Sequence, residues 1–196
     1  MFQRLPRLFG GYARNRILFT LALKGPQRRR ELSRAADVDP QQTLEIVRLF
    51  ARTGAIIYHP GKWKPIELNP RFCVASHLQN LILKIAEMQL PNSMPSLKAV
   101  KPTADVLELF GNRSRSLVLM ELANGPSVKT TTTIMAATSL TEQSVTAAVK
   151  YLERDAIVTS FVKCRARCIA INVNFSGSPE LRELLMSLRA AVSDSL

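Results

Sequence analysis

Residues 141–157 read TEQSVTAAVKYLERDAI, and the apolar positions of this stretch predict a half-buried helix. They recur at the i, i+3, i+4, i+7 spacing of one helix face, as Val145, Ala148, Val149 and Leu152. Thr141 is the expected N-cap, and Glu142 follows in the first turn, where the helix dipole favours an acidic side chain. The remaining positions then carry Gln143, Ser144, Thr146, Ala147 and Lys150.

A hairpin and a helix are expected after this stretch. Alternating apolar residues predict strands at 157–162 and 168–173, separated by a tip at 163–167. A final helix is expected to begin near Ser178, because Pro179 suits the first helical position. The chain therefore reverses once and then returns to helix.

Two further helices are expected before the stretch. Asn112 or Ser114 can cap a helix over about 113–123. We expect Ser127 to cap a second helix that ends at Ala137. Its buried side would include Val128, Ile134 and Met135. A short turn then leads into the third helix.

The same plan occurs a second time, about a hundred residues earlier. Leu8-Phe9-Gly10 recurs as Leu109-Phe110-Gly111, and IELNPRF at 66–72 recurs as IAINVNF at 169–175. Each of the two later segments precedes an apolar row, which is Leu78, Leu81, Ile82 and Ile85 in one copy and Leu181, Leu184, Leu185 and Leu188 in the other. The offset is 101 at the first motif and 103 at the last, which indicates a duplicated unit with small insertions.

We therefore expect two domains, at 1–90 and 106–196, joined by a proline-containing linker at 91–105. The elements expected in the first are helices at 14–23, 29–36 and from Asp39-Pro40 to Gly54, a hairpin over 55–68 and a helix over 74–88. Three helices followed by a hairpin and a helix form the winged helix-turn-helix plan. The expected fold class is mainly α with small β-hairpin wings (α+β), as two tandem winged helix-turn-helix domains.

Two segments resemble a known group of transcriptional regulators. Gly111-Asn112-Arg113-Ser114-Arg115, followed by its apolar helix, looks like the opening of ArsR-type and MarR-type winged-helix regulators. Residues 149–157 are similar to the end of their recognition helix; Ala156 stands where they usually have a glycine, and the first copy has Gly54 there. The resemblance implies that the third helix enters the DNA major groove and that the hairpin reaches neighbouring phosphates or the minor groove.

Charge also indicates a polyanionic partner. The chain has 27 Lys and Arg against 15 Asp and Glu, a formal net charge of +12. Residues 1–100 have 16 basic and 6 acidic side chains, whereas residues 101–196 have 11 and 9. We therefore expect double-stranded DNA as the partner and the first copy as the main source of affinity.

The candidate base-reading residues lie on the third helix of each copy. By position they are Gln41, Gln42, Thr43, Glu45 and Arg48 in the first, and Gln143, Ser144, Thr146, Ala147 and Lys150 in the second. Glutamine can bond to adenine through two hydrogen bonds, and short side chains allow close approach to base edges. Phosphate contacts are expected from the start of the second helix and from the hairpin tips, at Arg28, Arg29, Arg30, Lys62, Lys64, Lys163, Arg165 and Arg167. Trp63, between two of these lysines, could pack on a sugar or stack under a lysine.

Some of these basic residues have alternative roles. Arg28-Arg29-Arg30 could be a solvated charge run, and Trp63 could cover the domain core. The arginines at the start of the first helix of each copy are expected to serve packing and ion pairs; they are Arg14, Arg16, Arg113 and Arg115. The run Thr130 to Thr133 is unusual in a helix, and it could approach phosphates or weaken the helix.

The basic, acid-free N-terminus resembles a mitochondrial transit peptide. However, residues 8–18 have a counterpart at 109–119, so we expect them to belong to the folded unit. No apolar run approaches the ~20 residues of a transmembrane helix, and no secretory segment is recognisable. The expected location is the cytoplasm, in association with the nucleoid.

We expect no catalysis, cofactor or metal site. The sequence contains no glycine-rich phosphate loop, nucleophile elbow, HExxH motif or clustered carboxylate pair. Three cysteines argue against a disulfide framework. Cys164 and Cys168 have a spacing that could suit a metal or redox pair, but neither His59 nor His77 lies near them in sequence.

Two other functions stay open. One is a structural protein whose winged helices bind other proteins, as in chromosome-condensing complexes, although the basic first half argues against it. The other is replication initiation or partition on a mobile element, which also requires DNA binding. The apolar rows of the terminal helices could meet within the chain or form a homodimer.

Overall fold

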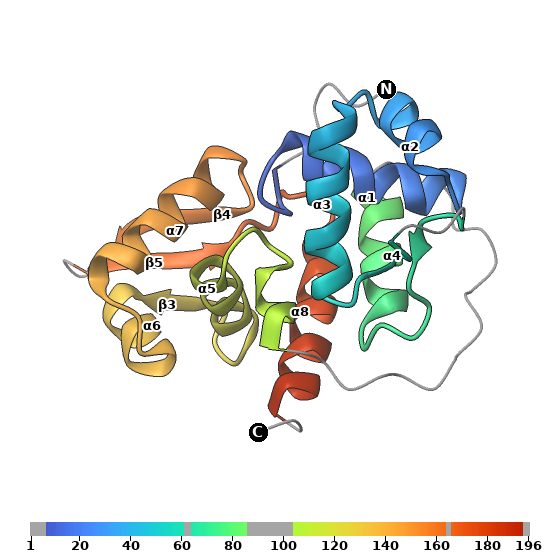
Figure 1. Ribbon diagram of the computed structural model, residues 1–196. Coiled ribbons are helices and arrows are strands. Elements are labelled where there is room, and N and C mark those ends of the chain that lie inside the picture. Colours follow the sequence, from blue (N-terminus) through green and yellow to red (C-terminus); the bar gives the residue numbers. More distant parts are fainter. Residues whose placement is uncertain (1–6, 61–63, 86–103, 164–165, 194–196) are drawn as a thin grey trace.

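The computed structural model describes residues 7–60, 64–85, 104–163 and 166–193, and it is mostly helical with two small antiparallel sheets (Figure 1). The first unit, as we define it, contains α1 (Tyr12–Lys24), α2 (Arg29–Ala36), α3 (Pro40–Arg52), β1 (Ile56–Ile57), β2 (Glu67–Leu68) and α4 (Ala75–Ile85). The mixed α and β class expected from the sequence is confirmed. The part of the expected fourth helix beyond residue 85, and nearly all of the linker at 91–105, lie outside the described residues.

The second unit repeats this order with one more strand. It contains the 3-10 helix η1 (Ala104–Glu108), α5 (Arg113–Ala123), β3 (Val128–Thr130), α6 (Thr131–Thr138), α7 (Glu142–Arg154), β4 (Val158–Lys163), β5 (Ala166–Ile171) and α8 (Ser178–Ser193). Its sheet has the order β3-β5-β4, with both pairs antiparallel. None of the helices in the described ranges combines the length and hydropathy that a bilayer-spanning segment needs.

The expected helix over 127–137 is wrong at its start, because β3 occupies residues 128–130. Lys129 faces the interior and pairs with Glu121 of α5, while Val128, expected to be buried, is 40% exposed. This alternation is that of a strand, and the strand pairs with β5. Thr130, rather than Ser127, caps α6: its hydroxyl accepts a hydrogen bond from the Thr133 backbone N–H at 3.2 Å.

Glu121 is the centre of a buried charge cluster in the second unit. One carboxylate oxygen pairs with Lys129, and the other accepts from Arg189 of α8 at 3.1 Å. Glu121 and Lys129 are both less than 9% exposed, so each charge depends on its partners. The cluster ties α5, β3 and α8 together.

The second and third helices of the two units correspond residue by residue. α3 and α7 each have 13 residues, and α2 and α6 each have 8, all at an offset of 102. The first unit has a single bridge, Gln27 to Ile66, where the second pairs Lys129 with Ile169. The duplication seen in the sequence is therefore also a duplication of structure.

Equivalent residues of the two units meet at a close crossing of the chain. The rings of Phe9 and Phe110 stack with centroids 5.8 Å apart. Gly10 and Gly111 have φ values of +95° and +100°, and a Cβ placed on Gly10 would lie 2.6 Å from the Gly111 Cα. Only glycine satisfies both the backbone conformation and the contact at this crossing.

The last helices of the two units, α4 and α8, also pack together (Figure 1). The two apolar rows expected from the sequence are buried, at Leu78, Leu81, Ile82, Ile85, Leu181, Leu184, Leu185 and Leu188. Gly177, just before α8, lies against Leu81 and Ile85 of α4. The rows therefore meet within the chain, and the two units share one continuous core.

Two ion pairs join the edges of this contact. Arg7, before α1, lies 3.8 Å from Asp155, after α7. Arg52, at the end of α3, lies 4.0 Å from Glu108, before α5. Each pair joins the segment before the first helix of one unit to the end of the third helix of the other, so the contact has the pattern of a two-fold interface.

Candidate nucleic-acid interface

α3 presents a polar face that begins at a well-defined cap. The carboxylate of Asp39 accepts hydrogen bonds from the backbone N–H groups of Gln41 and Gln42, at 2.8 and 3.1 Å. Pro40 occupies the first helical position, as expected. The exposed side chains of this helix include Gln41, Gln42, Glu45 and Arg48. Four of the five candidates of the first unit are therefore accessible to a ligand.

Thr43 is the exception, and its expected role in base reading is wrong. The residue is fully buried, and its hydroxyl donates to the Val38 carbonyl at a long 3.5 Å. It precedes the buried Val47 by four residues and Phe50 by seven, so it lies on the core face of the helix. A side chain in that place contributes to packing and cannot reach a base edge.

α7 presents a similar face in the second unit. Gln143, Thr146, Ala147 and Lys150 are exposed, and the expected apolar face is buried. Ser144 is half-buried beside the cap: its backbone N–H donates to the Thr141 hydroxyl oxygen, and the two hydroxyl groups are 2.9 Å apart. Ser144 therefore helps to begin the helix.

The three arginines at the start of α2 are exposed. Glu31 accepts a hydrogen bond from the Arg28 backbone N–H at 3.0 Å, so an acidic residue offsets part of the cost of cations at a helix N-terminus. Gln27 and Ile66 exchange two backbone hydrogen bonds, of 2.9 and 2.7 Å. This bridge holds the start of α2 beside the strand that follows Lys64, which is also exposed.

The second unit has threonines in the same place. Thr130, Thr131 and Thr132 occupy the positions of Arg28, Arg29 and Arg30, because the caps and bounds of α2 and α6 correspond at the offset of 102. Thr130 serves as the cap, which gives the threonine run a structural role. Three positive charges of the first unit therefore have no counterpart here.

The structure describes only some of the candidate residues at the two hairpin tips. Lys62, Trp63 and Arg165 lie outside the described residues. Lys163 is exposed at the end of β4, and its backbone pairs with Ala166, so the tip is shorter than expected. Arg167 lies in β5 and pairs with Glu153 of α7 at 3.1 Å, so its guanidinium also anchors the hairpin to that helix.

Three of the four first-helix arginines show the expected packing and pairing, whereas Arg113 is exposed. Arg16 forms an ion pair with Asp37 at 2.9 Å, and Arg14 donates to the Gly111 carbonyl at 3.2 Å. Arg115 stacks on Tyr151, with its guanidinium carbon 3.5 Å from the ring centroid. Burial and then the neighbouring charge of Arg115 lower the pKa of the Arg14 guanidinium.

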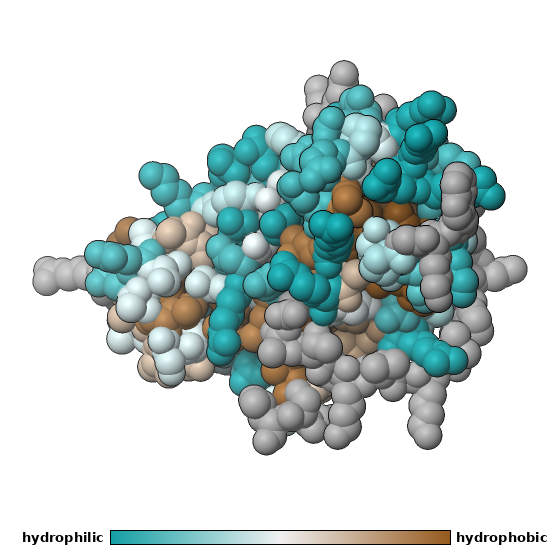
Figure 2. All heavy atoms as spheres, viewed as in Figure 1, coloured by the Kyte–Doolittle hydropathy of each residue, from teal (hydrophilic) through white to brown (hydrophobic). Residues whose placement is uncertain are grey.

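Sequence reasoning missed one exposed arginine of this surface. Arg34 of α2 is exposed and follows Arg30 by four residues, a spacing that places both side chains on one helix face. The four-residue spacing from Arg30 is the sequence signal that indicates Arg34 as a further candidate. Hydrophilic residues gather over α2 and the adjoining part of α3 (Figure 2).

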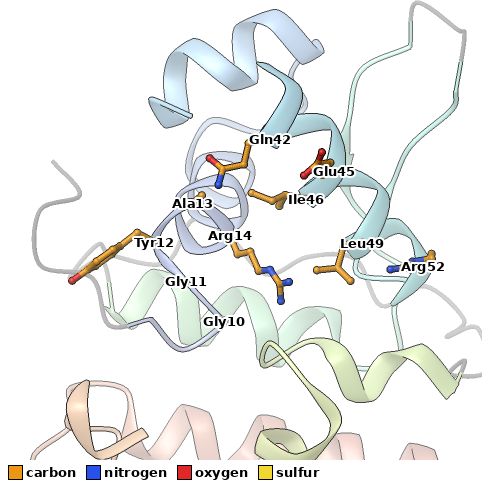
Figure 3. A pocket seen from close by; sticks show the side chains of 10 residues that line it. All are labelled: Gly10, Gly11, Tyr12, Ala13, Arg14, Gln42, Glu45, Ile46, Leu49 and Arg52. Carbon is orange, nitrogen blue, oxygen red and sulfur yellow. The ribbon is translucent and has the colours of Figure 1, made fainter. Parts of the chain in front are cut away.

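A groove of about 620 Å³ lies between the start of α1 and α3 (Figure 3). The residues that line it include Arg14 from α1 and Gln42, Glu45, Ile46, Leu49 and Arg52 from α3. The groove depends on the packing of residues 10–14 against α3, and α2 separates the two in sequence. No sequence pattern indicated it.

The cysteines of the described chain are separate from one another. Cys73 is half-buried and Cys168 is buried, and both are free thiols. Burial raises the pKa of the Cys73 thiol. Among the described residues, which leave out Cys164, no three His, Cys, Asp or Glu side chains gather as metal ligands.

The chain matches no protein-family model, no curated protein and no solved structure. The first unit combines three features: an exposed cationic start of α2, a polar face on α3, and a hairpin held beside the start of α2.

Proposed function

We propose that the chain is a DNA-binding protein, a transcriptional regulator of the ArsR and MarR kind, built from two winged helix-turn-helix units. The order of α1 to α4 and of α5 to α8 supports this proposal. In each unit the second and third helices are joined by a short turn, and an antiparallel hairpin follows. α3 and α7 are the recognition helices of this proposal, and the hairpins are its wings.

The observation that carries the proposal is the difference in charge between the two units at the start of the second helix. The first unit has three exposed arginines at the start of α2, and the second has three threonines there, the first of which caps α6. A cluster of cations at a helix start opposes the helix dipole, so it costs stability locally. That cost is explained if phosphates lie against the helix start when DNA is bound.

The second observation is the two-fold pattern of the contact between the units. Phe9 meets Phe110, Gly10 meets Gly111, and α4 meets α8. Dimeric helix-turn-helix proteins read two half-sites about 34 Å apart through such a symmetric arrangement. One chain would then act as a pseudo-dimer in which the first unit supplies most of the electrostatic attraction.

The direct test is a titration of labelled random-sequence duplex with the full chain at several salt concentrations. Each neutralised phosphate contributes about 0.9 to the slope of log affinity against log salt. We expect a steep negative slope for the wild-type chain and a shallower slope when Arg48 or Lys64 is changed to Ala. Binding that does not change with salt would contradict the proposal.

One observation favours a second candidate, in which the second unit binds a protein. Phe161 and Val162, in β4, are 42% and 76% exposed. Residues 101–196 have a formal net charge of only +2, so electrostatic attraction to DNA would be weak there. Selection from a random DNA pool separates the two: a motif with two half-sites supports the pseudo-dimer, and a single half-site assigns the second unit to another partner.

A further inference from the structure

The groove between α1 and α3 has a counterpart in the second unit that shows what can occupy it. Tyr151 stands there at the position of Leu49, because α3 and α7 correspond at the offset of 102. Two guanidinium groups lie over the Tyr151 ring: the carbon of Arg115 is 3.5 Å from the ring centroid and that of Arg154 is 4.6 Å. The second unit thus fills this place with an aromatic ring of its own.

The first unit keeps both arginines and lacks the ring. Arg14 corresponds to Arg115, and Arg52 corresponds to Arg154. Figure 3 shows the two side chains on either side of Leu49, at the groove. Leucine has neither the planar face nor the π electrons that favour a guanidinium above a ring. The groove of about 620 Å³ is large enough for a small ligand.

The balance of charge close to Arg14 favours an anion. Arg14 and Arg52 are among its lining residues, and Glu45 is the acidic one. Glu108 pairs with Arg52 at 4.0 Å and so compensates part of that charge. Arg14 hydrogen-bonds a neutral carbonyl, that of Gly111. Burial lowers the pKa of its guanidinium, and the like charge of Arg115 acts on it more strongly than the opposite charge of Glu108. A negative group beside Arg14 would offset the cost of its burial.

We propose that this groove binds a planar aromatic molecule with an acidic substituent. Its ring stacks on the Arg14 guanidinium as Tyr151 stacks on Arg115, and its acidic group lies near the two arginines. The inference does not rest on the proposed DNA binding, because its evidence is the groove, its arginines and the difference between Leu49 and Tyr151. Gln42 and Glu45 line the groove and are also base-reading candidates.

The test is calorimetric titration of the full chain with indole-3-carboxylate. Cyclohexanecarboxylate is the matched comparator, because it has the same charge and no aromatic ring. We expect saturable binding of the first probe, and binding of the comparator that is weaker by about five-fold or more, as the loss of a cation–π contact implies. Leu49→Tyr fills the groove with the side chain of the second unit, and we expect it to abolish saturable binding of indole-3-carboxylate.

Two further variants keep the test decisive. Leu49→Ala removes the same leucine without filling the groove, and we expect it to retain binding. Arg14→Lys keeps the charge and removes the planar guanidinium, so it should weaken the indole probe and leave the comparator unchanged. Each variant is first checked for a wild-type circular dichroism spectrum. No saturable binding by the wild-type chain, equal binding of the two probes, or full binding by Leu49→Tyr would each overturn the proposal.

Discussion

Replacing Arg28, Arg29 and Arg30 by threonine gives the first unit the α2 start of the second. The three side chains are exposed, and the backbone of this segment already has the form that Thr130 to Thr132 adopt at the start of α6. Threonine at position 28 can act as an N-cap, which is worth about 1 kcal/mol to a helix. We therefore expect the triple variant to fold with unchanged or slightly higher stability.

Its affinity for DNA should fall by an amount that depends on salt. Three lost phosphate contacts reduce the slope of log affinity against log salt by about 2.7. With equal affinities at about 1 M salt, this slope difference corresponds to a loss of about 170-fold at about 0.15 M and of about 12-fold at about 0.4 M. The assay is fluorescence anisotropy of a labelled duplex, titrated at both concentrations.

The control removes the same charge elsewhere. Arg71, Lys84 and Arg113 are exposed and lie outside α2, α3 and the hairpins, so their triple replacement by threonine should change the slope far less. An equal loss for both triple variants would show that only net charge matters. A wild-type slope for the α2 variant would refute the assignment of these arginines to phosphate contact.

Urea denaturation tests three features of the fold. Gly111→Ala should lower the free energy of unfolding by about 2 kcal/mol or more, because φ is +100° and the added Cβ would lie 2.7 Å from the Gly10 Cα; a neutral result would contradict the close crossing. Asp39→Ala should cost about 1 kcal/mol through the lost cap of α3, and an unchanged midpoint would show that the cap is dispensable. Glu121→Ala should cost about 3–5 kcal/mol, because Lys129 then remains buried with no carboxylate partner; a cost near zero would mean that water reaches this lysine.

The sequence predicts the helices well where their apolar periodicity is long. α7 has its apolar face and its cap where the pattern places them, and Asp39 begins α3 as expected. β3 was missed because a strand of three residues carries little pattern of its own. Its burial of Lys129 depends on Glu121, which another element supplies. Such a pairing is decided by packing rather than by local sequence.

The candidate site was predictable to a similar extent. The exposed positions of α3 follow from its period, and the same period would have placed Thr43 with Val47 and Phe50 in the core. The correspondence between the arginine and threonine runs depends on the 102-residue offset of the α2 and α6 caps, which the motif offsets of 101 and 103 do not determine. The groove could not be predicted, because it depends on the packing of α1 against α3 and on the Gly10 crossing.

The most direct test of DNA recognition by the first unit is selection of bound fragments from a random duplex pool at two salt concentrations. The wild-type chain and the Arg28, Arg29 and Arg30 triple threonine variant are compared in parallel. We predict that the wild-type chain enriches a defined motif, with less material bound at the higher salt, and that the variant loses most of the bound material. No enriched motif for the wild-type chain, together with equal recovery by both proteins at both salt concentrations, would contradict the proposal.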